Sequence, residues 1–246
     1  MVLFDAHCHL LTDADLRTAL NAGVRGLVVN AVRPDDWTRV ADMAATRAGV
    51  FGALGVHPWC VAAGDGLQRG RVPHDWAVRL RDILAAHPDL MVGEVGLDKT
   101  RPDIAAQADV FNAHLQIAHD LGRTVHVHCV GAWGMMADIL QVAPRVPAIV
   151  FHGFSGAPDI MPQLARYNAY FSFGAGVMNP HRTRVRTAAT NADARRILVE
   201  SDAPDSGLSP ADLATVVAQI AALRGCDATG LADMIYENST RVVQNG

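Results

Sequence analysis

The feature that most constrains the fold is an alternation of strand-like and helix-like segments along the whole chain. Eight short apolar runs predict strands, at residues 2–9, 24–32, 50–55, 91–97, 124–128, 148–152, 169–173 and 197–202. Between them, apolar residues recur at helical spacing, as from Trp37 to Ala44. Continuous apolar strands are typical of parallel sheets that helices cover on both faces. The pattern therefore predicts an α/β protein with a (β/α)8 barrel of the TIM type.

The length and composition of the chain favour one domain over residues 1–246. A (β/α)8 barrel takes about 250 residues, and half of this 246-residue chain is hydrophobic, enough for one large core. The segment 63–66 is rich in turn formers, and we expect a surface loop there instead of a domain boundary. Two helical stretches near the C-terminus, at 212–223 and 228–237, are expected to cover the outside of the barrel.

Charge and cysteine content limit the partners and the compartment. The net charge of −4 gives no general attraction for nucleic acid or an anionic membrane, so a polyanion needs local binding groups. The four cysteines contain no Cys-x-x-Cys pair, which is typical of a reduced cytosolic protein. No apolar run is long enough to span a membrane. We expect a cytoplasmic protein without membrane contact, and the sequence indicates no obligate protein partner.

Asp5, His7 and His9 alternate at the end of the first predicted strand. Because alternate residues of a strand point to one face, we expect the three side chains to project together into the barrel. His9 would lie nearest the C-terminal rim, where barrels of this type carry their active sites. Taken alone, the two histidines are either metal ligands or a hydrogen-bonded pair in the core.

Four more ionisable residues lie near the C-terminal ends of other predicted strands: Glu94, His128, His152 and Asp202. Burying so many of these groups in one barrel mouth costs several kcal/mol per charge unless something compensates. Four neutral histidines and two carboxylates are sufficient ligands for two divalent metal ions, with one carboxylate bridging and water completing each shell. The sequence therefore predicts a centre with two ions of zinc, manganese or magnesium.

Motifs in a fixed order carry a family resemblance. They are Asp-Ala-His-Cys-His at 5–9, Gly-Val-His-Pro-Trp at 55–59, Gly-Glu-Val-Gly-Leu-Asp at 93–98, Phe-His-Gly-Phe-Ser-Gly at 151–156, Glu-Ser-Asp-Ala-Pro at 200–204 and Asn-Ser-Thr-Arg at 238–241. The chain resembles, over its whole length, the TatD family of metal-dependent deoxyribonucleases and hydrolases, which has an amidohydrolase-like barrel. The resemblance implies that a first metal ion is held by His7, His9, Glu94 and Asp202, and that Glu94 bridges to a second ion held by His128 and His152.

The chemistry that this implies is metal-assisted hydrolysis of an ester bond. A water molecule with its pKa lowered toward about 7 is the nucleophile, and Asp202 orients and deprotonates it. Some related barrels bridge their metals with a modified lysine. Glu94 is the better bridge here, because the single lysine, Lys99, lies in a loop-like segment beyond the fourth strand.

Further residues are expected to support the centre. His57 resembles the family position that contacts substrate. Glu200 and Asp5 each precede a ligand by two residues, and each either accepts a ring N–H from a ligating histidine or is a buried structural carboxylate. His126 lies one layer below His128 and is expected to be a hydrogen-bonded core or supporting histidine.

Two departures from the family pattern concern the substrate. Val130 stands where the family continues with an arginine, and the loop after Pro204 lacks a further arginine and asparagine. The basic run from Arg182 to Arg186 either substitutes as a phosphate clamp or is a solvated first helical turn. Three functions stay open: a TatD-like deoxyribonuclease that cuts DNA, a hydrolase of a small amide, ester or lactone, and a metal-binding scaffold without turnover.

Overall fold

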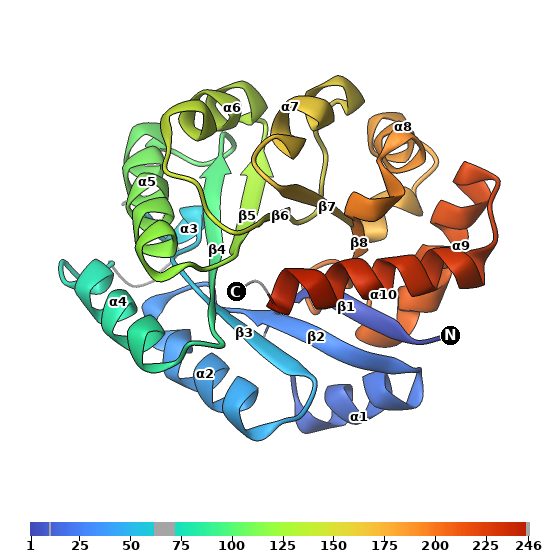
Figure 1. The fold of residues 1–246 in the computed structure, drawn as a ribbon, viewed down its shortest axis with the longest axis horizontal. Helices are drawn as coiled ribbons and strands as arrows, with labels where there is room; N and C mark the ends of the chain where they lie inside the picture. The colour runs from blue at the N-terminus through green and yellow to red at the C-terminus, as the bar shows by residue number, and fades with distance from the viewer. Residues whose placement is uncertain (10, 62–71, 245–246) are drawn as a thin grey trace.

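The computed structural model describes residues 1–9, 11–61 and 72–244. Within them, eight strands form a single parallel sheet in the order β1 to β8, curled into a barrel (Figure 1). The strands are β1 (Leu3–Cys8), β2 (Val24–Asn30), β3 (Val50–Leu54), β4 (Met91–Asp98), β5 (Val125–Val130), β6 (Ile149–Phe151), β7 (Ala169–Phe173) and β8 (Ile197–Val199). The predicted parallel (β/α)8 barrel is confirmed.

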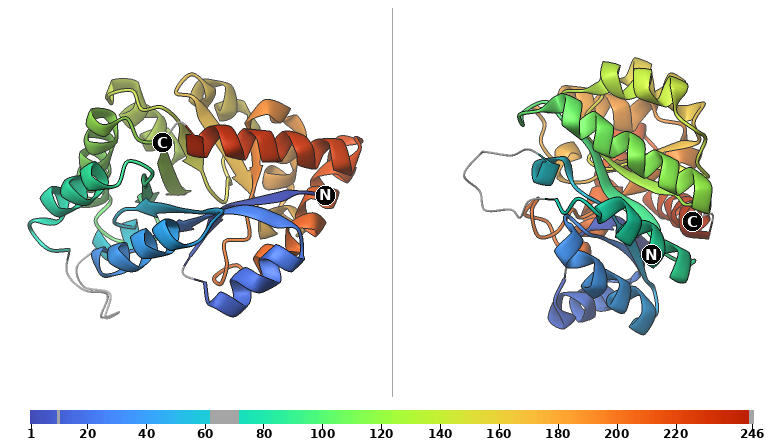
Figure 2. Two further views of the ribbon diagram at one scale, coloured as in Figure 1. Left: turned by 60° about the horizontal axis from the view of Figure 1, so that its bottom comes forward. Right: turned by 90° about the vertical axis from the view of Figure 1, so that its left-hand side faces the viewer.

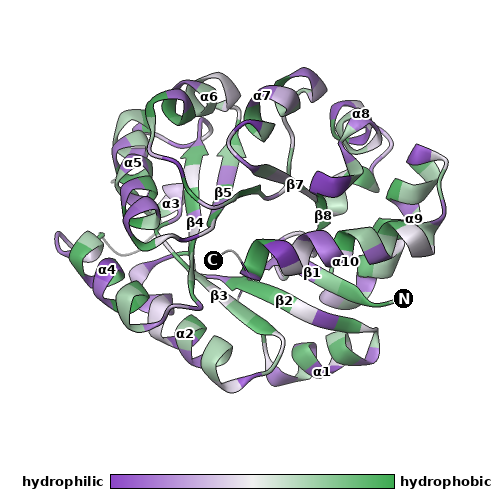
Figure 3. Cartoon of the chain, in the orientation of Figure 1, coloured by the Kyte–Doolittle hydropathy of each residue, from purple (hydrophilic) through white to green (hydrophobic). Residues whose placement is uncertain are grey.

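Helices surround the barrel (Figure 2). In the described part of the chain they are α1 (Asp13–Asn21), α2 (Trp37–Thr46), α3 (Pro58–Val61), α4 (Trp76–Ala86), α5 (Ile104–Leu121), α6 (Trp133–Val142), α7 (Met161–Ala165), α8 (Thr183–Asn191), α9 (Leu213–Arg224) and α10 (Ala228–Gln244). Hydrophobic residues concentrate on the strands and on the helix faces that meet them (Figure 3). The segment 63–66, predicted as a surface loop, lies outside the described residues.

The sequence pattern predicts that the last helix lies on the outside of the barrel. This prediction is wrong for α10. In α10, Val242 packs with Ala6, Val150 and Leu198 from the barrel interior, and its carbonyl accepts a hydrogen bond from Thr124 Oγ1 at 3.2 Å. Because Thr124 immediately precedes β5, α10 covers the N-terminal end of the barrel. The opposite, C-terminal end of the barrel is not covered by this helix.

The barrel is joined between its first and last strands by hydrogen bonds just beyond the strand ends. Asp202 N–H donates to the His7 carbonyl at 2.9 Å, and His9 N–H donates to the Ala203 carbonyl at 2.8 Å. The predicted eighth strand, 197–202, is shorter in the structure because β8 ends at Val199 and Asp202 has a left-handed φ of 50°. Asp202 thus lies in a strained turn beside β1 and not within a strand.

In described residues, no helix combines the length and apolar character needed to cross a membrane. Cys8, Cys129 and Cys226 form no disulfide with any described residue.

One buried histidine gives the fold a pH dependence of its own. In α5, His114 is fully buried, stacks on Trp76 with 4.4 Å between ring centroids, and bonds through Nδ1 to the Val110 carbonyl at 2.7 Å. Burial lowers the pKa of His114 to about 4, well below an unfolded value of about 6.5. The folded state therefore holds the neutral ring, and the resulting stability is present above pH 6.5 and is lost as the pH falls toward 4.

We predict that His114→Phe, which keeps the ring stacking, reduces this acid sensitivity. The free energy of unfolding of the wild type should fall more between pH 7 and pH 5 than that of the variant, by about 2 kcal/mol. Urea unfolding of the two proteins at both pH values measures the difference. Equal losses of unfolding free energy in the two proteins would show that His114 is not the source of the acid sensitivity.

Candidate active site

A bulge near the end of β1 determines where the side chain of His7 points. Between Asp5 and Cys8 the strand advances three residues while β2 advances two, from Leu27 to Val29. A bulge of this kind breaks the alternation of side chains and re-aims them. The His7 ring consequently stacks on the ring of His152, 3.9 Å away, in the barrel mouth.

The same bulge explains why Asp5 does not share the face of His7. Its carboxylate accepts hydrogen bonds from Ser201 N–H at 2.9 Å, Ser201 Oγ–H at 2.5 Å and the His7 backbone N–H at 3.2 Å. These contacts join β1 to the turn that carries Asp202. The expected projection of Asp5 with His7 and His9 is thus wrong, and its contacts fit the alternative role of a buried structural carboxylate.

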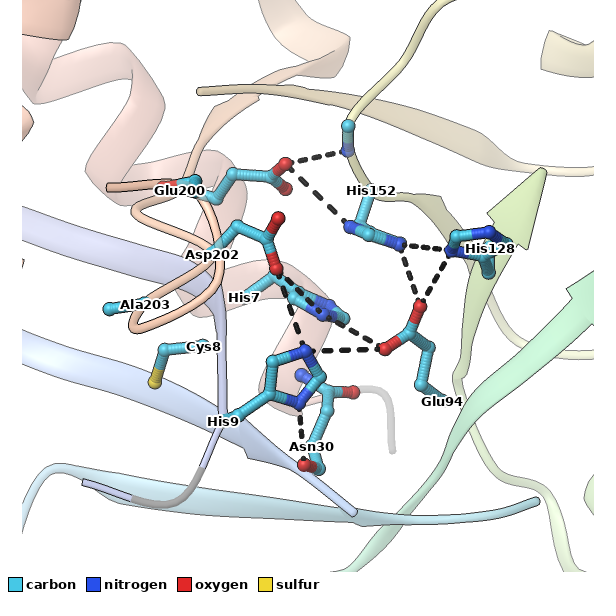
Figure 4. Close-up of polar contacts among 12 residues, drawn as sticks. His7, Cys8, His9, Asn30, Glu94, His128, His152, Glu200, Asp202 and Ala203 are labelled. Carbon is cyan, nitrogen blue, oxygen red and sulfur yellow. Dashed lines mark hydrogen bonds and ion pairs between the residues drawn. The ribbon is translucent and has the colours of Figure 1, made fainter. Parts of the chain in front are cut away.

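Glu94 stands at the centre of the site, and it also lies at a bulge. From Val92 to Val95 strand β4 advances three residues against two in β5. The Glu94 side chain is 1% exposed and points between two sets of histidines (Figure 4). Oε2 lies 3.3 Å from His7 Nε2 and 3.6 Å from His9 Nε2.

The other carboxylate oxygen of Glu94 faces the histidines of β5 and of the loop after β6. Oε1 lies 3.0 Å from His128 Nδ1 and 2.7 Å from His152 Nε2. Those two nitrogens are 3.1 Å apart. The two oxygens of one carboxylate therefore face two different groups of nitrogen atoms.

Asp202 completes the first of these groups. Its Oδ1 lies 3.5 Å from His9 Nε2 and 3.9 Å from His7 Nε2. We call His7, His9 and Asp202 with Glu94 Oε2 the first donor group, and His128 and His152 with Glu94 Oε1 the second donor group. All six predicted ligands are brought together (Figure 4).

Hydrogen bonds outside the centre fix which ring nitrogens carry lone pairs. His9 Nδ1 lies 3.1 Å from the Asn30 carbonyl, which can only accept, so the proton is on Nδ1 and Nε2 offers a lone pair to the site. His128 Nε2 faces the Asp98 carboxylate at 3.4 Å, which leaves Nδ1 with the lone pair. Such an outward partner is usual for histidines that bind metal.

The hydrogen bonds of His57 place its ring proton on the nitrogen that faces the site, unlike those of His9 and His128. Its Nδ1 accepts a hydrogen bond from Trp59 N–H at 3.1 Å, so the neutral ring carries its proton on Nε2, 3.1 Å from Glu94 Oε1. The ring therefore donates to the Glu94 carboxylate. Predicted from sequence only as a substrate contact, His57 also lies against the centre itself, and its burial lowers its pKa to about 4 despite the nearby charge of Glu94.

Charges within the site shift its pKa values strongly. Burial disfavours the Glu94 carboxylate, but the imidazoles of His152, His57 and His7 outweigh burial and hold the pKa of Glu94 well below its usual value. Burial likewise opposes protonation of His9, yet Asp202 and Glu94 raise its pKa to about 9. Protons are thus drawn to the place where a cation would stand, and they compete with a metal ion for the same donors.

The donor set fits divalent metal ions. Ligand atoms of His7, His9 and Asp202 lie within 4.8 Å of one another, as do those of His7, Glu94 and His152. His7 Nε2 and Glu94 Oε2 are buried without a hydrogen-bond partner among the described residues. Buried lone pairs that converge without donors carry a large desolvation cost, which a coordinated cation removes.

Asp98 has a larger role than its sequence position suggested. Its Oδ1 accepts a hydrogen bond from Thr100 N–H at 2.8 Å in the loop after β4. Oδ2 also accepts from Trp59 Nε1 at 2.6 Å and faces His128. The link from Asp98 to His128 spans two strands, so no local sequence signal reveals it.

Glu200 immediately follows the end of β8. Its Oε1 accepts a hydrogen bond from Gly153 N–H at 2.6 Å and lies 3.7 Å from His152 Nδ1. By contrast, His126 was expected to be hydrogen-bonded, and this is wrong for the described residues, in which neither ring nitrogen has a partner. Burial holds the pKa of His126 well below its usual value, so the ring is neutral.

Two cavities reach the donors. The inner cavity, of about 230 Å³, is lined by His9, His57, Trp59 and Asp202, among others. The side cavity, of about 510 Å³, shares His128, His152 and Asp202 and extends over the loops after β6, β7 and β8.

A parallel barrel whose C-terminal mouth holds a ring of histidines around a buried carboxylate defines a metal-dependent hydrolase with the amidohydrolase-like fold. The chain belongs to the family of TatD related DNases, which matches residues 4–244.

Relatives and solved structures agree with this family. The 3'-5' ssDNA/RNA exonuclease TatD of Enterobacter lignolyticus (strain SCF1) is 28% identical over 236 residues, which cover 89% of this chain and 88% of the relative. The uncharacterized metal-dependent hydrolase YjjV of Escherichia coli (strain K12) is 24% identical over 252 residues, covering 96% and 95%. The crystal structure of YJJV, a TatD homologue from E. coli K12, matches with a TM-score of 0.86 and 25% identity over 98% of this chain and 97% of that one.

Proposed function

We propose that this protein hydrolyses phosphodiester bonds of single-stranded DNA, and of RNA with the same chemistry, at a centre of two divalent metal ions. The observation that carries the proposal is the position of Glu94, whose two oxygens face two separate donor groups. The first donor group would hold one ion, the second donor group the other, and Glu94 would bridge them. The nucleic-acid substrate is supported by the relative whose printed name is a 3'-5' ssDNA/RNA exonuclease.

Two bound cations would supply a water of low pKa and stabilise the attacking and leaving oxygens of the phosphodiester. The protein residues supply the rest. Asp202, whose Oδ1 faces the first donor group, orients the attacking water and accepts its proton. His57 Nε2–H donates to Glu94 and fixes the orientation of that carboxylate. His57 also lines the inner cavity, so its ring edge would contact the substrate there.

The base role of Asp202 leads to a prediction. Asp202→Asn keeps the size and one ligand oxygen, so we expect two metal ions per chain to be largely retained. Because the amide cannot accept the proton, kcat should fall by about 10²- to 10⁴-fold. Release of nucleotides from end-labelled single-stranded DNA and RNA measures this, with metal-stripped protein resupplied with manganese, magnesium or zinc.

Asp233→Asn is the matched control, because it makes the same chemical change at an exposed position of α10, which covers the end of the barrel away from the donor groups. It should stay within about threefold of the wild type, since it takes no part in the proton transfer. Full activity of Asp202→Asn, or an equal loss in Asp233→Asn, would remove the base assignment.

The same assay separates the other functions. A wild type that binds two metals but cleaves no nucleic acid, and instead hydrolyses a small amide, ester or lactone, would replace the proposed substrate. No turnover on any of these substrates would leave a metal-binding scaffold. We place the activity in one catalytic domain, residues 1–246, and in the cytoplasm, because Cys8, Cys129 and Cys226 form no disulfide with any described residue, as in a reducing environment.

A further inference from the structure

The side cavity extends well beyond the donor groups. Its volume of about 510 Å³ is in the range of small-ligand sites, about 300–1,000 Å³. One part of its wall is formed by His128, His152 and Asp202, and another by Gly176 and Arg182 from the segment between β7 and α8. A ligand held at the donor groups would therefore extend toward Arg182.

Arg182 is the only lysine or arginine among the described residues that line the two cavities. Its backbone is fixed on both sides, because its N–H donates to the Asn179 carbonyl at 3.1 Å and its carbonyl accepts from Arg186 N–H at 3.1 Å. Its side chain passes over Gly176, where a Cβ would lie only 3.9 Å from Arg182 Cδ. The guanidinium forms no hydrogen bond or ion pair with any described residue.

The other arginines of the basic run are placed differently. Arg184 is exposed and lines neither cavity. Arg186 donates to the Val177 carbonyl at 2.7 Å and supports the loop. Among the described residues, only Arg182 thus places a cation that has no described partner in the wall of the cavity that reaches the donor groups.

The surroundings of Arg182 select the chemistry of its ligand. Glu200, Asp202 and Asp205 also line the side cavity, and Arg182 is the one arginine or lysine among its described lining residues, so an anionic group of a ligand would be attracted to the guanidinium. A guanidinium offers a planar set of N–H donors that matches two oxygens of a phosphate. A phosphodiester chain is a ligand with one phosphate for the metal centre and a second for Arg182.

We propose that Arg182 binds a phosphate of the nucleic-acid strand next to the one that is hydrolysed, an inference that rests on the proposed function. Arg182 positions the strand and takes no part in bond cleavage. Substrates with several phosphates gain from this contact, whereas a substrate with a single phosphodiester does not.

The test compares Arg182→Gln with Arg184→Gln on two substrates, a single-stranded oligonucleotide and bis(p-nitrophenyl) phosphate, which has one phosphodiester and no neighbour. Arg182→Gln should lower kcat/KM for the oligonucleotide by about tenfold, mainly through KM. It should also lower the slope of log(kcat/KM) against log[salt] by about 0.7. Activity on bis(p-nitrophenyl) phosphate should stay within about twofold of the wild type, because no second phosphate is lost.

Binding provides a readout without turnover. In metal-loaded Asp202→Asn protein, the added Arg182→Gln change should weaken binding of a fluorescein-labelled oligonucleotide by about tenfold. Arg184→Gln should leave both readouts near their reference values. Equal effects of the two variants, or an equal loss on both substrates, would overturn the assignment of Arg182. A wild type that cleaves neither substrate with any metal would instead overturn the proposed function and this assignment with it.

Discussion

Glu94→Gln should lose nearly all hydrolytic activity, with kcat reduced by about a thousandfold or more. Under the proposed function, Glu94 would hold both metal ions, whose stabilisation of transition-state charge would contribute several kcal/mol, and each 1.36 kcal/mol corresponds to a factor of ten. An amide offers one oxygen and one NH2 group, so it cannot ligate two ions. Metal content, measured by mass spectrometry after desalting, should fall from two ions per chain to one or none.

Glu237→Gln is the control for this experiment. It makes the same chemical change at an exposed position of α10, at the far end of the barrel, and should leave activity and metal content unchanged. If Glu94→Gln kept two tightly bound ions and substantial turnover, Glu94 would not be the bridge.

Gly96→Ala should destabilise the protein by about 3 kcal/mol or more. Gly96 has a φ of 143°, in a region that residues with a side chain rarely adopt, and it pairs with His128 of β5. A Cβ at this position would overlap the His128 carbonyl oxygen and lie 2.9 Å from its carbonyl carbon. The backbone of a residue in the second donor group would therefore have to move, so activity should fall together with stability.

Gly134→Ala is the matched control, because it makes the same substitution at a position with room for a side chain. Gly134 lies in α6, and nothing is within 4 Å of the added Cβ. Because alanine favours helix over glycine, this variant should be stabilised by about 0.5–1 kcal/mol. Urea unfolding of both variants measures the contrast. A Gly96→Ala protein as stable as the wild type would show that the two strands can separate without cost.

The alternating apolar runs were enough to predict the barrel. Each of the eight predicted strands overlaps an observed one, because both faces of a parallel barrel are buried and its strands are nearly continuous apolar runs. The position of α10 was not predicted. A helical apolar face indicates that the helix is covered, but it does not tell whether it packs on the outside of a barrel or across its end.

The ring of candidate ligands was also predicted, because His128 and His152, like Glu94, interrupt apolar strands near their C-terminal ends. The failures come from places where the alternation of side chains is broken. The bulge in β1 turns Asp5 toward Ser201, and the turn after β8 places Asp202 outside any strand. Such irregularities depend on pairing between distant segments, which local sequence patterns do not contain.

The roles of Asp98 and Arg182 needed three-dimensional contacts for the same reason. Asp98 reaches His128 across two strands, and Arg182 faces a cavity that several separate loops form together. In the sequence, Arg182 is one member of a basic run and cannot be distinguished from its neighbours.

The most direct test of the dinuclear centre is an anomalous-scattering map from crystals grown with manganese or zinc. We expect two peaks about 3.5–4 Å apart, one among His7, His9 and Asp202 and one between His128 and His152, with Glu94 between them. A single peak, or two peaks that do not share Glu94, would contradict the account.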